Sequence, residues 1–298
     1  MKAVIPAAGL GTRFMPVTKS IPKEMLPVLD KPVIQYIVEE AVAAGVDECI
    51  IVTNENKTEI PDHFQRNLAL EDELRGLGKD AYADTIEAAG NLRVSYVYQH
   101  QPLGLGHAVY CASGATADES FYVMLGDVLV PENTVLPLMK SVSDEHGGAS
   151  VIAVIAVDRS EVDRFGIIAG EWIGEAPGQP QGTSDTPGAV WRVASLVEKP
   201  ALDEAPSRLA IFGRYLLTSR VQDLLQHGTP GHGGEIQLTD ALDVLLEEEE
   251  VYALVIDPDE GFDTGTVPNL IATNVKMALR DERYAEALKL QLGIQDLT

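Results

Sequence analysis

The chain has 298 residues, of which 45% are hydrophobic and 23% are charged, and its formal net charge is −24. This composition is that of a folded globular protein and excludes a largely disordered chain, while the negative charge repels a nucleic-acid backbone and argues against a nucleic-acid partner. No apolar run reaches the roughly 18 residues of a membrane span and no signal peptide precedes the first strand, so we expect a cytoplasmic protein without a membrane partner.

The first half of the sequence alternates between segments typical of strands and segments typical of helices. Apolar residues recur at helical spacing from Val33 to Val42, and Gly45 ends this helix before the apolar strand Cys49-Ile50-Ile51-Val52. The same alternation predicts a strand at 3–5, a helical stretch near 58–76, a strand at 93–98, a helix near 105–114 and a strand at 121–125. We therefore predict an α/β fold with a mixed, mainly parallel sheet, helices on both faces and ligands at the carboxyl ends of the strands.

The pattern changes after about residue 148. It then predicts a strand at 150–157, a hairpin of 165–171 with 190–197, and helices near 218–226, 236–249 and 268–290. The segment 174–188 is rich in Gly, Pro, Ser and Thr, which predicts a mobile loop. Because no period of 20–50 residues repeats, we expect a single domain over 1–298, with halves at about 1–148 and 149–298.

The most specific feature is a glycine-rich loop directly after the first strand. The loop reads Ala7-Ala8-Gly9-Leu10-Gly11-Thr12-Arg13, and Lys23 follows it. Glycines let a backbone approach a nucleotide closely and point N–H groups at phosphates, while Arg13 and Lys23 supply cations for a triphosphate. The fingerprint of an NAD(P)-binding oxidoreductase would need a glycine where Phe14 stands, and a P-loop would need Gly-Lys-Ser/Thr, which is missing.

Two acidic residues are candidates for binding a divalent cation. Asp127 follows the apolar strand at 121–125, and Asp263 lies in Phe262-Asp263-Thr264-Gly265-Thr266. Mg²⁺ prefers oxygen ligands in an octahedral shell, so two carboxylates with the oxygens of a triphosphate would suit it. Each residue also has a structural alternative, because Asp127 could form a turn and Asp263 could cap the helix that follows it.

Together, the glycine-rich loop and the segment Pro22-Lys23-Glu24-Met25-Leu26-Pro27 resemble the signature of the sugar nucleotidylyltransferase family. The resemblance implies a Rossmann-like nucleotidyltransferase fold with a nucleotide-binding first half and a sugar-binding second half. It also implies how the nucleotide is bound. The backbone of Ala8 and Gly9 would contact the base, Gly11 and Arg13 would lie over the phosphates, and Thr12 and Glu24 would make further contacts. Arg13, Lys23 and Asp127 would be the catalytic residues, with Lys23 at the transferred phosphate and Asp127 and Asp263 binding Mg²⁺.

Further segments resemble the sugar-binding motifs of that family. Phe165-Gly166 is similar to its Tyr/Phe-Gly pair, whose backbone contacts the sugar. Val197-Glu198-Lys199-Pro200 is similar to its Glu-Lys-Pro, which implies that Glu198 holds sugar hydroxyls and Lys199 the sugar phosphate. Ile211 would contribute backbone contacts only. Without the resemblance, a Glu-Lys pair is usually a surface salt bridge of little energetic value.

The resemblance also indicates a pyrimidine nucleotide. Gln99 and Gly104 lie in a segment that is similar to the base-binding segment of the family, where a Gln side chain and a Gly backbone pair with a pyrimidine. The stretch 63–74 is similar to a helical insert of the uridylyltransferases in that family. The implied reaction joins UTP to glucose 1-phosphate with Mg²⁺ and releases UDP-glucose and pyrophosphate, by in-line attack on the α-phosphorus. His107 is more typical of a helix start than of a catalytic base, because a sugar phosphate is already an anionic nucleophile.

Two alternatives within the resemblance stay open: a transferase for a thymidylyl, adenylyl or guanylyl group, and a non-catalytic regulatory relative. The 63–74 stretch and Gln99 argue against the first. The intact set of charged residues argues against the second. A homodimer or homotetramer is implied by the resemblance, and it is favoured by apolar residues of the last helix that could otherwise fold back onto their own domain: Ala287, Leu288, Leu290 and Leu292.

Overall fold

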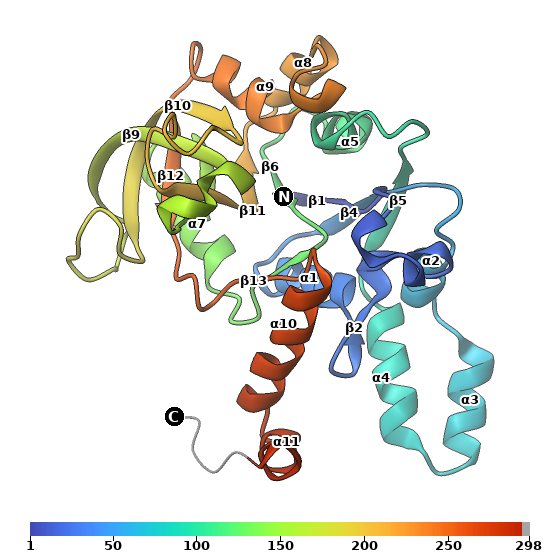
Figure 1. Ribbon diagram of the computed structural model, residues 1–298. Helices are drawn as coiled ribbons and strands as arrows, with labels where there is room; N and C mark the ends of the chain where they lie inside the picture. The colour runs from blue at the N-terminus through green and yellow to red at the C-terminus, as the bar shows by residue number, and fades with distance from the viewer. Residues whose placement is uncertain (294–298) are drawn as a thin grey trace.

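The computed structural model describes residues 1–293 and is built around a mixed β-sheet (Figure 1). Within the described residues, nine strands form this sheet in the order β5-β4-β1-β6-β11-β8-β12-β10-β9. Neighbours are parallel from β5 to β6 and between β8 and β12, and antiparallel elsewhere. The predicted mixed sheet is therefore confirmed, but it is not mainly parallel, because half of the neighbouring pairs among the described strands are antiparallel. The longest parallel run belongs to the first half of the chain.

The strands of the large sheet are Lys2–Pro6 (β1), Glu48–Thr53 (β4), Val94–Tyr98 (β5), Phe121–Met124 (β6), Ser150–Ala156 (β8), Gly166–Glu175 (β9), Ala189–Glu198 (β10), Leu209–Leu217 (β11) and Val251–Val255 (β12). Two small ribbons pair Pro27–Val28 (β2) with Lys31–Pro32 (β3), and Val128–Leu129 (β7) with Phe262–Asp263 (β13). The helices are Val33–Ala43 (α1), Glu59–Phe64 (α2), Leu68–Gly76 (α3), Asp80–Gly90 (α4), Leu105–Cys111 (α5), Ser113–Thr116 (α6), Val135–Glu145 (α7), Arg220–Gln226 (α8), Leu238–Leu245 (α9), Val267–Arg280 (α10) and Ala285–Leu292 (α11).

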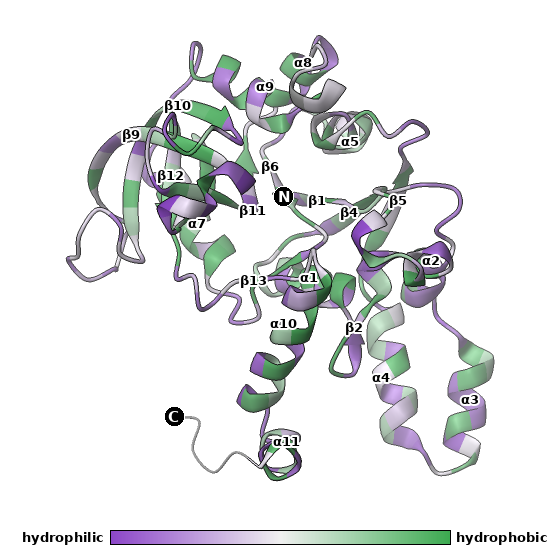
Figure 2. Cartoon of the chain, in the orientation of Figure 1, coloured by the Kyte–Doolittle hydropathy of each residue, from purple (hydrophilic) through white to green (hydrophobic). Residues whose placement is uncertain are grey.

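Helices cover both faces of the sheet, as predicted. Alternate residues of β1 point to opposite faces, because Ala3 and Ile5 join one buried cluster and Val4 joins the other. The first cluster also contains buried side chains of α1 and α7, and the second those of α5, α8 and α9. Figure 2 shows the same arrangement as green, hydrophobic segments on the strands and on parts of these helices. Among the described helices, none has both the length and the apolar character that crossing a bilayer requires.

The region after β4 differs in part from the prediction. The stretch 58–76 contains two helices, α2 and α3, and a further helix, α4, packs beside α3 in a hairpin that projects from the body (Figure 1). No helix was predicted over α4, although Ala83, Ile86 and Ala89 recur at helical spacing in this segment. Ala83 and Ala89 are the buried residues of this helix, so it buries a narrow apolar face.

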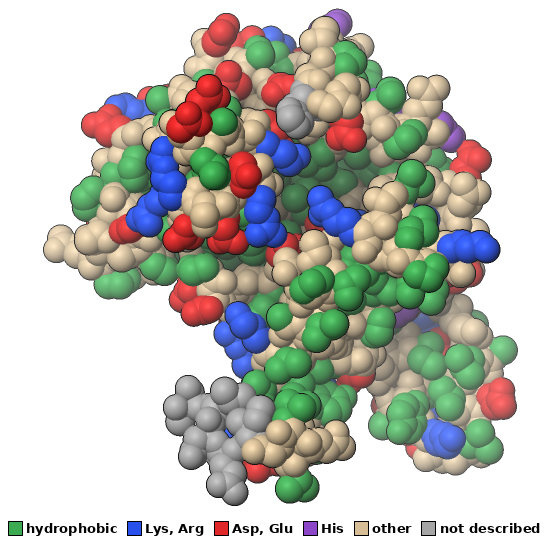
Figure 3. All heavy atoms as spheres, in the orientation of Figure 1, with side chains coloured by type: hydrophobic (Ala, Val, Ile, Leu, Met, Phe, Trp, Pro, Cys, Tyr) green, Lys and Arg blue, Asp and Glu red, His purple; other side chains and the backbone are tan. Residues whose placement is uncertain are grey.

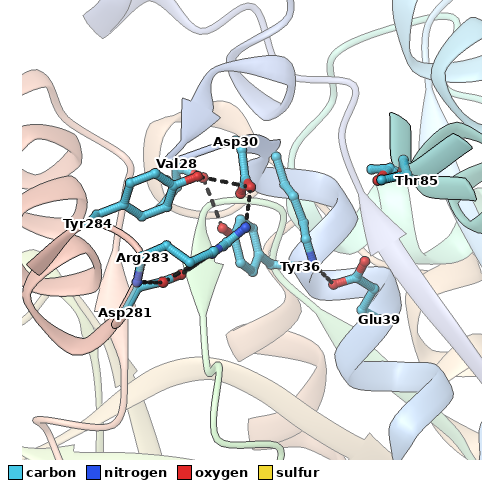
Figure 4. Close-up of polar contacts among 10 residues, drawn as sticks. Val28, Asp30, Tyr36, Glu39, Thr85, Asp281, Arg283 and Tyr284 are labelled. Atoms are coloured by element: carbon cyan, nitrogen blue, oxygen red, sulfur yellow. Dashed lines mark hydrogen bonds and ion pairs between the residues drawn. The ribbon is translucent and has the colours of Figure 1, made fainter. Parts of the chain in front are cut away.

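The helix predicted over 268–290 is interrupted between α10 and α11. The carboxylate of Asp281 accepts hydrogen bonds from the side chain and the backbone N–H of Arg283. Arg283 Nη1 and the Tyr284 hydroxyl both contact Asp30 Oδ2, at 2.8 and 3.2 Å (Figure 4). These contacts hold the α10–α11 junction against the turn between β2 and β3. The chain leaves the helical path at this junction to make them.

The loop predicted at 174–188 closes the hairpin of β9 and β10. The two strands pair in register from Gly166 with Glu198 at one end to Glu175 with Ala189 at the other. The loop therefore lies at the far end of the hairpin from Gly166 and Glu198, and Figure 1 shows it extending away from the centre of the molecule. This position argues against a lid over those two residues. The mobility of the loop stays a prediction, as does the division of the chain into two functional halves.

Candidate active site

Two adjoining cavities open at the carboxyl ends of β1 and β6. The first cavity has a volume of about 450 Å³, and its lining includes Ala8, Gly9, Gly11, Thr12, Lys23, Glu24, Gln99, Gly104 and Asp127. The second cavity has a volume of about 440 Å³, and its lining includes Arg13, Asp127, Lys199, Ile211 and Asp263. Leu125 and Asp127 line both cavities, so the two meet at the end of β6.

Positive side chains gather here although the chain as a whole carries a net charge of −24. Lys23 lines the first cavity, and Arg13 and Lys199 line the second. Figure 3 shows Lys and Arg side chains at the edge of a hollow in this face of the molecule. The two cavities are therefore suited to anionic groups such as phosphates.

At Gly11 the glycine-rich loop adopts a backbone conformation that favours glycine. This residue has a φ of +64°, and its carbonyl accepts a hydrogen bond from the Thr18 hydroxyl at 2.8 Å. A Cβ atom at Gly11 would lie 3.0 Å from Thr18 Cγ2 and 3.3 Å from Lys23 Cβ. The loop therefore packs closely over the segment that carries Lys23, and a side chain at Gly11 would push the two apart.

Two side chains that follow β4 hold the start of the loop. Asn54 donates to the carbonyl of Ala8 at 2.9 Å, and Lys57 donates to the carbonyl of Ala7. Lys57 also forms an ion pair of 2.9 Å with Glu24, which is fully buried. Burial raises the pKa of the Glu24 carboxyl, and the charge of Lys57 opposes this rise. The second oxygen, Oε1, is buried and has no hydrogen-bond partner within the described residues.

Lys23 and Asp127 form the charged centre at which the cavities meet. Lys23 Nζ lies 2.6 Å from Asp127 Oδ2, and both side chains are mostly buried. Desolvation acts to lower the pKa of Lys23, but the negative charges of Asp127 and Glu24 outweigh it, so the pKa lies above its ordinary value. The Lys23 side chain is therefore an ammonium ion at neutral pH, directed at a carboxylate.

The ribbon of β7 and β13 brings a second carboxylate to the same place. Asp263 pairs in register with Val128, the residue that follows Asp127. Thr264 donates to the Asp127 carbonyl from its backbone N–H at 2.7 Å and from its hydroxyl at 2.8 Å. A Cβ atom at Gly265 would lie 2.9 Å from Asp263 Oδ1 and 3.1 Å from Asp127 Oδ2. The carboxylates of Asp127 and Asp263 therefore both face the space beside Gly265.

The two carboxylates fit a Mg²⁺ ion that also binds phosphate oxygens. Within residues 1–293, no three His, Cys, Asp or Glu side chains are arranged to hold a metal by themselves. Two carboxylates leave most of an octahedral shell for phosphate oxygens and water, which is common for Mg²⁺. The helix-cap alternative for Asp263 is wrong, because the Thr266 hydroxyl caps α10 by accepting from Asn269 N–H. Asp263 Oδ2 accepts from the Asn269 amide at 2.6 Å, which orients the carboxylate.

Gln99 and Gly104 also line the first cavity. The Gln99 side-chain amide donates to the Gly104 carbonyl at 3.1 Å and contacts His107 Nδ1 at 2.9 Å. Burial lowers the pKa of His107, so the neutral ring that can accept at Nδ1 is favoured. His107 therefore orients Gln99, which agrees with the expectation that it is not a catalytic base.

The second half of the chain brings the other predicted residues together. Gly166 and Glu198 are register partners in β9 and β10. A Cβ atom at Gly166 would lie 3.0 Å from Ile211 Cδ1 and 3.1 Å from Glu198 Oε2. The Glu198 carboxylate accepts from the Thr239 hydroxyl at 2.8 Å and pairs with Lys199 Nζ at 3.0 Å. A fixed carboxylate beside a partly exposed ammonium ion is suited to a ligand that carries both hydroxyl groups and a phosphate.

A comparison with known families decides the classification. Residues 2–280 match the model of the family described as nucleotidyl transferase. The chain belongs to the nucleotidyl transferase family. A curated relative, UTP–glucose-1-phosphate uridylyltransferase of Streptococcus pneumoniae, is 42% identical over 98% of this chain and 96% of its own. The protein of the same name from Bacillus subtilis is 43% identical over 96% of this chain and 94% of its own.

Solved structures of nucleotidyl transferases share the fold over nearly the whole chain. The UTP-bound UGPase from Acinetobacter baumannii has a TM-score of 0.86 and 36% identity, and the match covers 99% of both chains. A UDP-glucose pyrophosphorylase complexed with UDP-glucose has a TM-score of 0.79 and 36% identity, over 94% of this chain and 99% of that one. The resemblance drawn from the glycine-rich loop is therefore confirmed, and so is the nucleotidyltransferase fold.

Sequence reasoning missed four polar side chains of this nucleotidyl transferase site. Asn54 and Lys57 directly follow a buried parallel strand, at the sheet edge where ligands are expected, so a search of every strand end could have found them. Thr239 and Asn269 lie inside α9 and α10, and no local pattern distinguishes them from other polar helix residues. Only the fold shows that they contact Glu198 and Asp263.

Proposed function

We propose that this chain is a UTP–glucose-1-phosphate uridylyltransferase, which converts UTP and glucose 1-phosphate to UDP-glucose and pyrophosphate. The observation that carries the proposal is that the two cavities meet at Asp127, with Lys23 2.6 Å from it. A nucleotide in the first cavity and a sugar phosphate in the second would have their phosphates adjacent at this point. Relatives named for this reaction, at 42% and 43% identity, support the choice of substrates.

The first cavity is proposed to hold UTP. The backbone of the glycine-rich loop lies against the base and the phosphates, and the carbonyl of Ala8 is fixed by Asn54. The pyrimidine edge pairs with the Gln99 side chain and the backbone of Gly104. Glu24, which borders this cavity, is proposed as a further nucleotide contact. A smaller pyrimidine suits this arrangement better than a purine.

The second cavity is proposed to hold the phosphate of glucose 1-phosphate, and the sugar is proposed to lie beside it at Gly166 and Glu198, which are not part of the cavity lining. Glu198 binds sugar hydroxyls through a carboxylate that Thr239 keeps in place. The backbone of Gly166 and of Ile211 borders the sugar. Lys199 turns from Glu198 to the phosphate group and holds it near the α-phosphorus of UTP. This placement converts an encounter of two anions into a reaction within one complex.

The proposed chemistry is a direct displacement. A phosphate oxygen of glucose 1-phosphate forms a bond to the α-phosphorus of UTP, and the bond from that phosphorus to the oxygen bridging the β-phosphorus breaks on the opposite side. Pyrophosphate leaves with the electron pair, so no protein nucleophile and no covalent enzyme intermediate are needed. Arg13 and Lys23 stabilise the negative charge that grows on the transferring phosphate.

Asp127 and Asp263 are proposed to hold Mg²⁺ through their carboxylates. A bound Mg²⁺ supplies Lewis-acid stabilisation of phosphate charge at this position. Thr264 holds the backbone of Asp127, and Asn269 orients the carboxylate of Asp263. Lys23 Nζ lies 2.6 Å from Asp127 Oδ2, so the ammonium group and the metal would share this carboxylate.

We expect UTP to be used at least about tenfold better than dTTP in kcat/KM, because a pocket that fits uracil closely rejects one added methyl group by about 1–3 kcal/mol. The measurement varies each nucleotide at saturating glucose 1-phosphate and Mg²⁺. Equal use of the two nucleotides would favour the thymidylyl alternative. No turnover with either, while UTP still binds, would favour the non-catalytic relative.

A substitution at Gly104 tests whether this backbone borders the nucleotide. Its φ is +106°, and a Cβ atom would lie 2.7 Å from both Glu235 Cβ and the Ile236 carbonyl oxygen. We expect Gly104→Ala to raise the KM for UTP by about tenfold, because the backbone must shift by enough to strain the contact with the base. Gly233→Ala is the control, since Gly233 also has a positive φ, of +70°, but open space around a Cβ atom. An unchanged KM in Gly104→Ala would remove this residue from the nucleotide site.

A homodimer or homotetramer is proposed from the exposed apolar surface of the last two helices. Val267, Ile271 and Val275 form one exposed stripe on α10, and Leu290 of α11 is 84% exposed. These side chains therefore do not fold back onto their own domain, and Figure 1 shows both helices projecting from the body. Light scattering is expected to give at least twice the chain mass of 32.1 kDa. A mass near that of one chain at every concentration would rule the oligomer out.

A cytoplasmic location and the absence of a nucleic-acid partner stay predictions.

A further inference from the structure

Arg214 is a fully buried charged residue that lines neither cavity. It lies in β11, all of whose residues are buried, and its side chain has no exposed surface. Its guanidinium donates to both carboxylate oxygens of Glu40 on α1, at 2.6 and 3.0 Å, and Glu40 is buried as well. Neither residue belongs to the predicted nucleotide or sugar contacts. A buried ion pair outside the site therefore needs a separate explanation.

The same guanidinium contacts the turn that carries Asp127. Arg214 Nη2 donates to the Val128 carbonyl at 2.7 Å, and Nη1 makes a longer contact of 3.5 Å with the Leu125 carbonyl. Leu125 and Val128 are the two ends of this turn, since Val128 N–H donates to the Leu125 carbonyl at 3.3 Å. Arg214 therefore connects both ends of the turn to helix α1 through Glu40.

The backbone beside Arg214 is shaped to reach this turn. Strand β11 has a register irregularity against β8 between Ile211 and Tyr215, and Gly213 within it has a φ of +69°. Leu125 N–H donates to the Gly213 carbonyl at 2.9 Å, and a Cβ atom at Gly213 would lie 2.8 Å from Val128 Cγ2. The irregular part of β11 thus packs directly against the Leu125–Val128 turn.

Stability alone does not explain a buried pair of this kind. Desolvating two charges costs several kcal/mol for each ion, and replacing such a pair by apolar side chains is often neutral or stabilising. An arginine offers five donors in a rigid fork, so it can serve two carboxylate oxygens and backbone carbonyls at once, which lysine cannot. The contacts of Arg214 use this property on Glu40 and on the two ends of the turn.

We propose that Arg214 and Glu40 are positioning residues for the metal ligand Asp127. They fix the Leu125–Val128 turn from within the core, while Thr264 fixes the Asp127 carbonyl from the other side. The proposal rests on the proposed function in one respect, the assignment of Asp127 as a Mg²⁺ ligand. Groups that orient a metal ligand commonly change metal affinity by 10–100-fold when they are removed. Loss of the pair should therefore weaken metal binding more than nucleotide binding.

The test measures Mn²⁺ binding in the presence of UTP, by the electron paramagnetic resonance signal of free Mn²⁺, and separately measures UTP binding without metal. The double variant Arg214→Met/Glu40→Leu removes both charges and keeps the core apolar. We expect it to fold and to bind metal-free UTP as the unmodified chain does, but to bind Mn²⁺ at least about tenfold more weakly. Arg214→Lys keeps a charge opposite Glu40 but cannot reach both ends of the turn, so it should show the same loss.

The control is Arg66→Met, which removes an arginine that contacts the mostly buried Glu71 through two hydrogen bonds, at the edge of the α3–α4 hairpin. We expect this variant to lose stability but not Mn²⁺ affinity. Undiminished Mn²⁺ binding by a folded double variant or by Arg214→Lys would overturn the proposal and leave the pair a packing role. Because the assay detects metal and not product, a chain that binds Mn²⁺ with UTP but makes no UDP-glucose would contradict the proposed function alone.

Discussion

Asp127→Asn is expected to lower kcat by about 100-fold or more, an effect of the size seen when one charge-stabilising group is removed from an active site. The amide that replaces the carboxylate keeps the shape of the side chain but loses the negative charge that Mg²⁺ and Lys23 both require. Lys23 Nζ lies 2.6 Å from this carboxylate, so the substitution disturbs two elements of the site at once. The measurement is the rate of pyrophosphate release at saturating UTP, glucose 1-phosphate and Mg²⁺.

The fold of the Asp127→Asn variant is expected to persist, because the turn around Asp127 is held by its backbone carbonyl and not by its carboxylate. Circular dichroism and thermal unfolding check this point. Asp144→Asn is the matched control, since Asp144 is an exposed acid on α7 that pairs with Lys140. Turnover near that of the unmodified chain in Asp127→Asn would remove Asp127 from the metal site. Asp263→Asn is expected to behave as Asp127→Asn does.

The two lysines of the site are expected to fail in different ways when replaced by alanine. Lys23→Ala should lower kcat by roughly 100-fold and change either KM less, because this ammonium meets charge that grows in the transition state. Lys199→Ala should mainly raise the KM for glucose 1-phosphate, by roughly tenfold to a hundredfold, because a hydrogen bond to a charged group contributes about 1.5–3 kcal/mol. The measurement is steady-state kinetics with each substrate varied separately.

Lys140→Ala is the control for the two lysine variants, since Lys140 is a partly exposed lysine on α7 that lines neither cavity. Lys23→Arg should restore little activity, because a planar guanidinium differs from a compact ammonium in reach and geometry. A Lys199→Ala variant in which only the KM for UTP changes would reverse the roles of the two cavities. An unchanged kcat in Lys23→Ala would show that this lysine does not act on the transferring phosphate.

The nucleotide half of the site could be predicted from sequence because its residues are close together along the chain. The loop from Ala8 to Arg13 follows β1 directly, and its glycines have a local physical reason, a positive φ at Gly11 and close packing over Lys23. Parallel strands also place their carboxyl ends at one edge of the sheet. A local motif on such a strand is therefore enough to predict where a ligand binds.

The contacts that orient these residues could not be predicted, because they join segments far apart in the sequence. Arg214 contacts Glu40 across 174 residues, and Thr264 contacts Asp127 across 137. No periodicity or spacing rule reports such pairs. Helix α4 is a different case, because Ala83, Ile86 and Ala89 recur at helical spacing and the sequence could have indicated this helix.

The prediction of one unbroken helix over 268–290 is wrong because contacts between distant segments interrupt it. Its apolar spacing continues past residue 281, so the pattern alone indicates one long helix. The break is set by tertiary contacts, those of Arg283 and Tyr284 with Asp30. Local propensity is overridden where a few polar contacts fix the chain in another direction.

The choice of UTP and glucose 1-phosphate as substrates can be checked by identifying the product that the purified chain forms from glucose 1-phosphate and Mg²⁺ with each of UTP, ATP, GTP and CTP in separate reactions. Chromatography of the nucleotide sugars and an assay of pyrophosphate give both products of each reaction. We expect UDP-glucose and an equal amount of pyrophosphate with UTP, and far slower formation of the other nucleotide sugars. An ADP-, GDP- or CDP-glucose formed as fast as UDP-glucose, or no nucleotide sugar from any of the four, would contradict this choice of substrates.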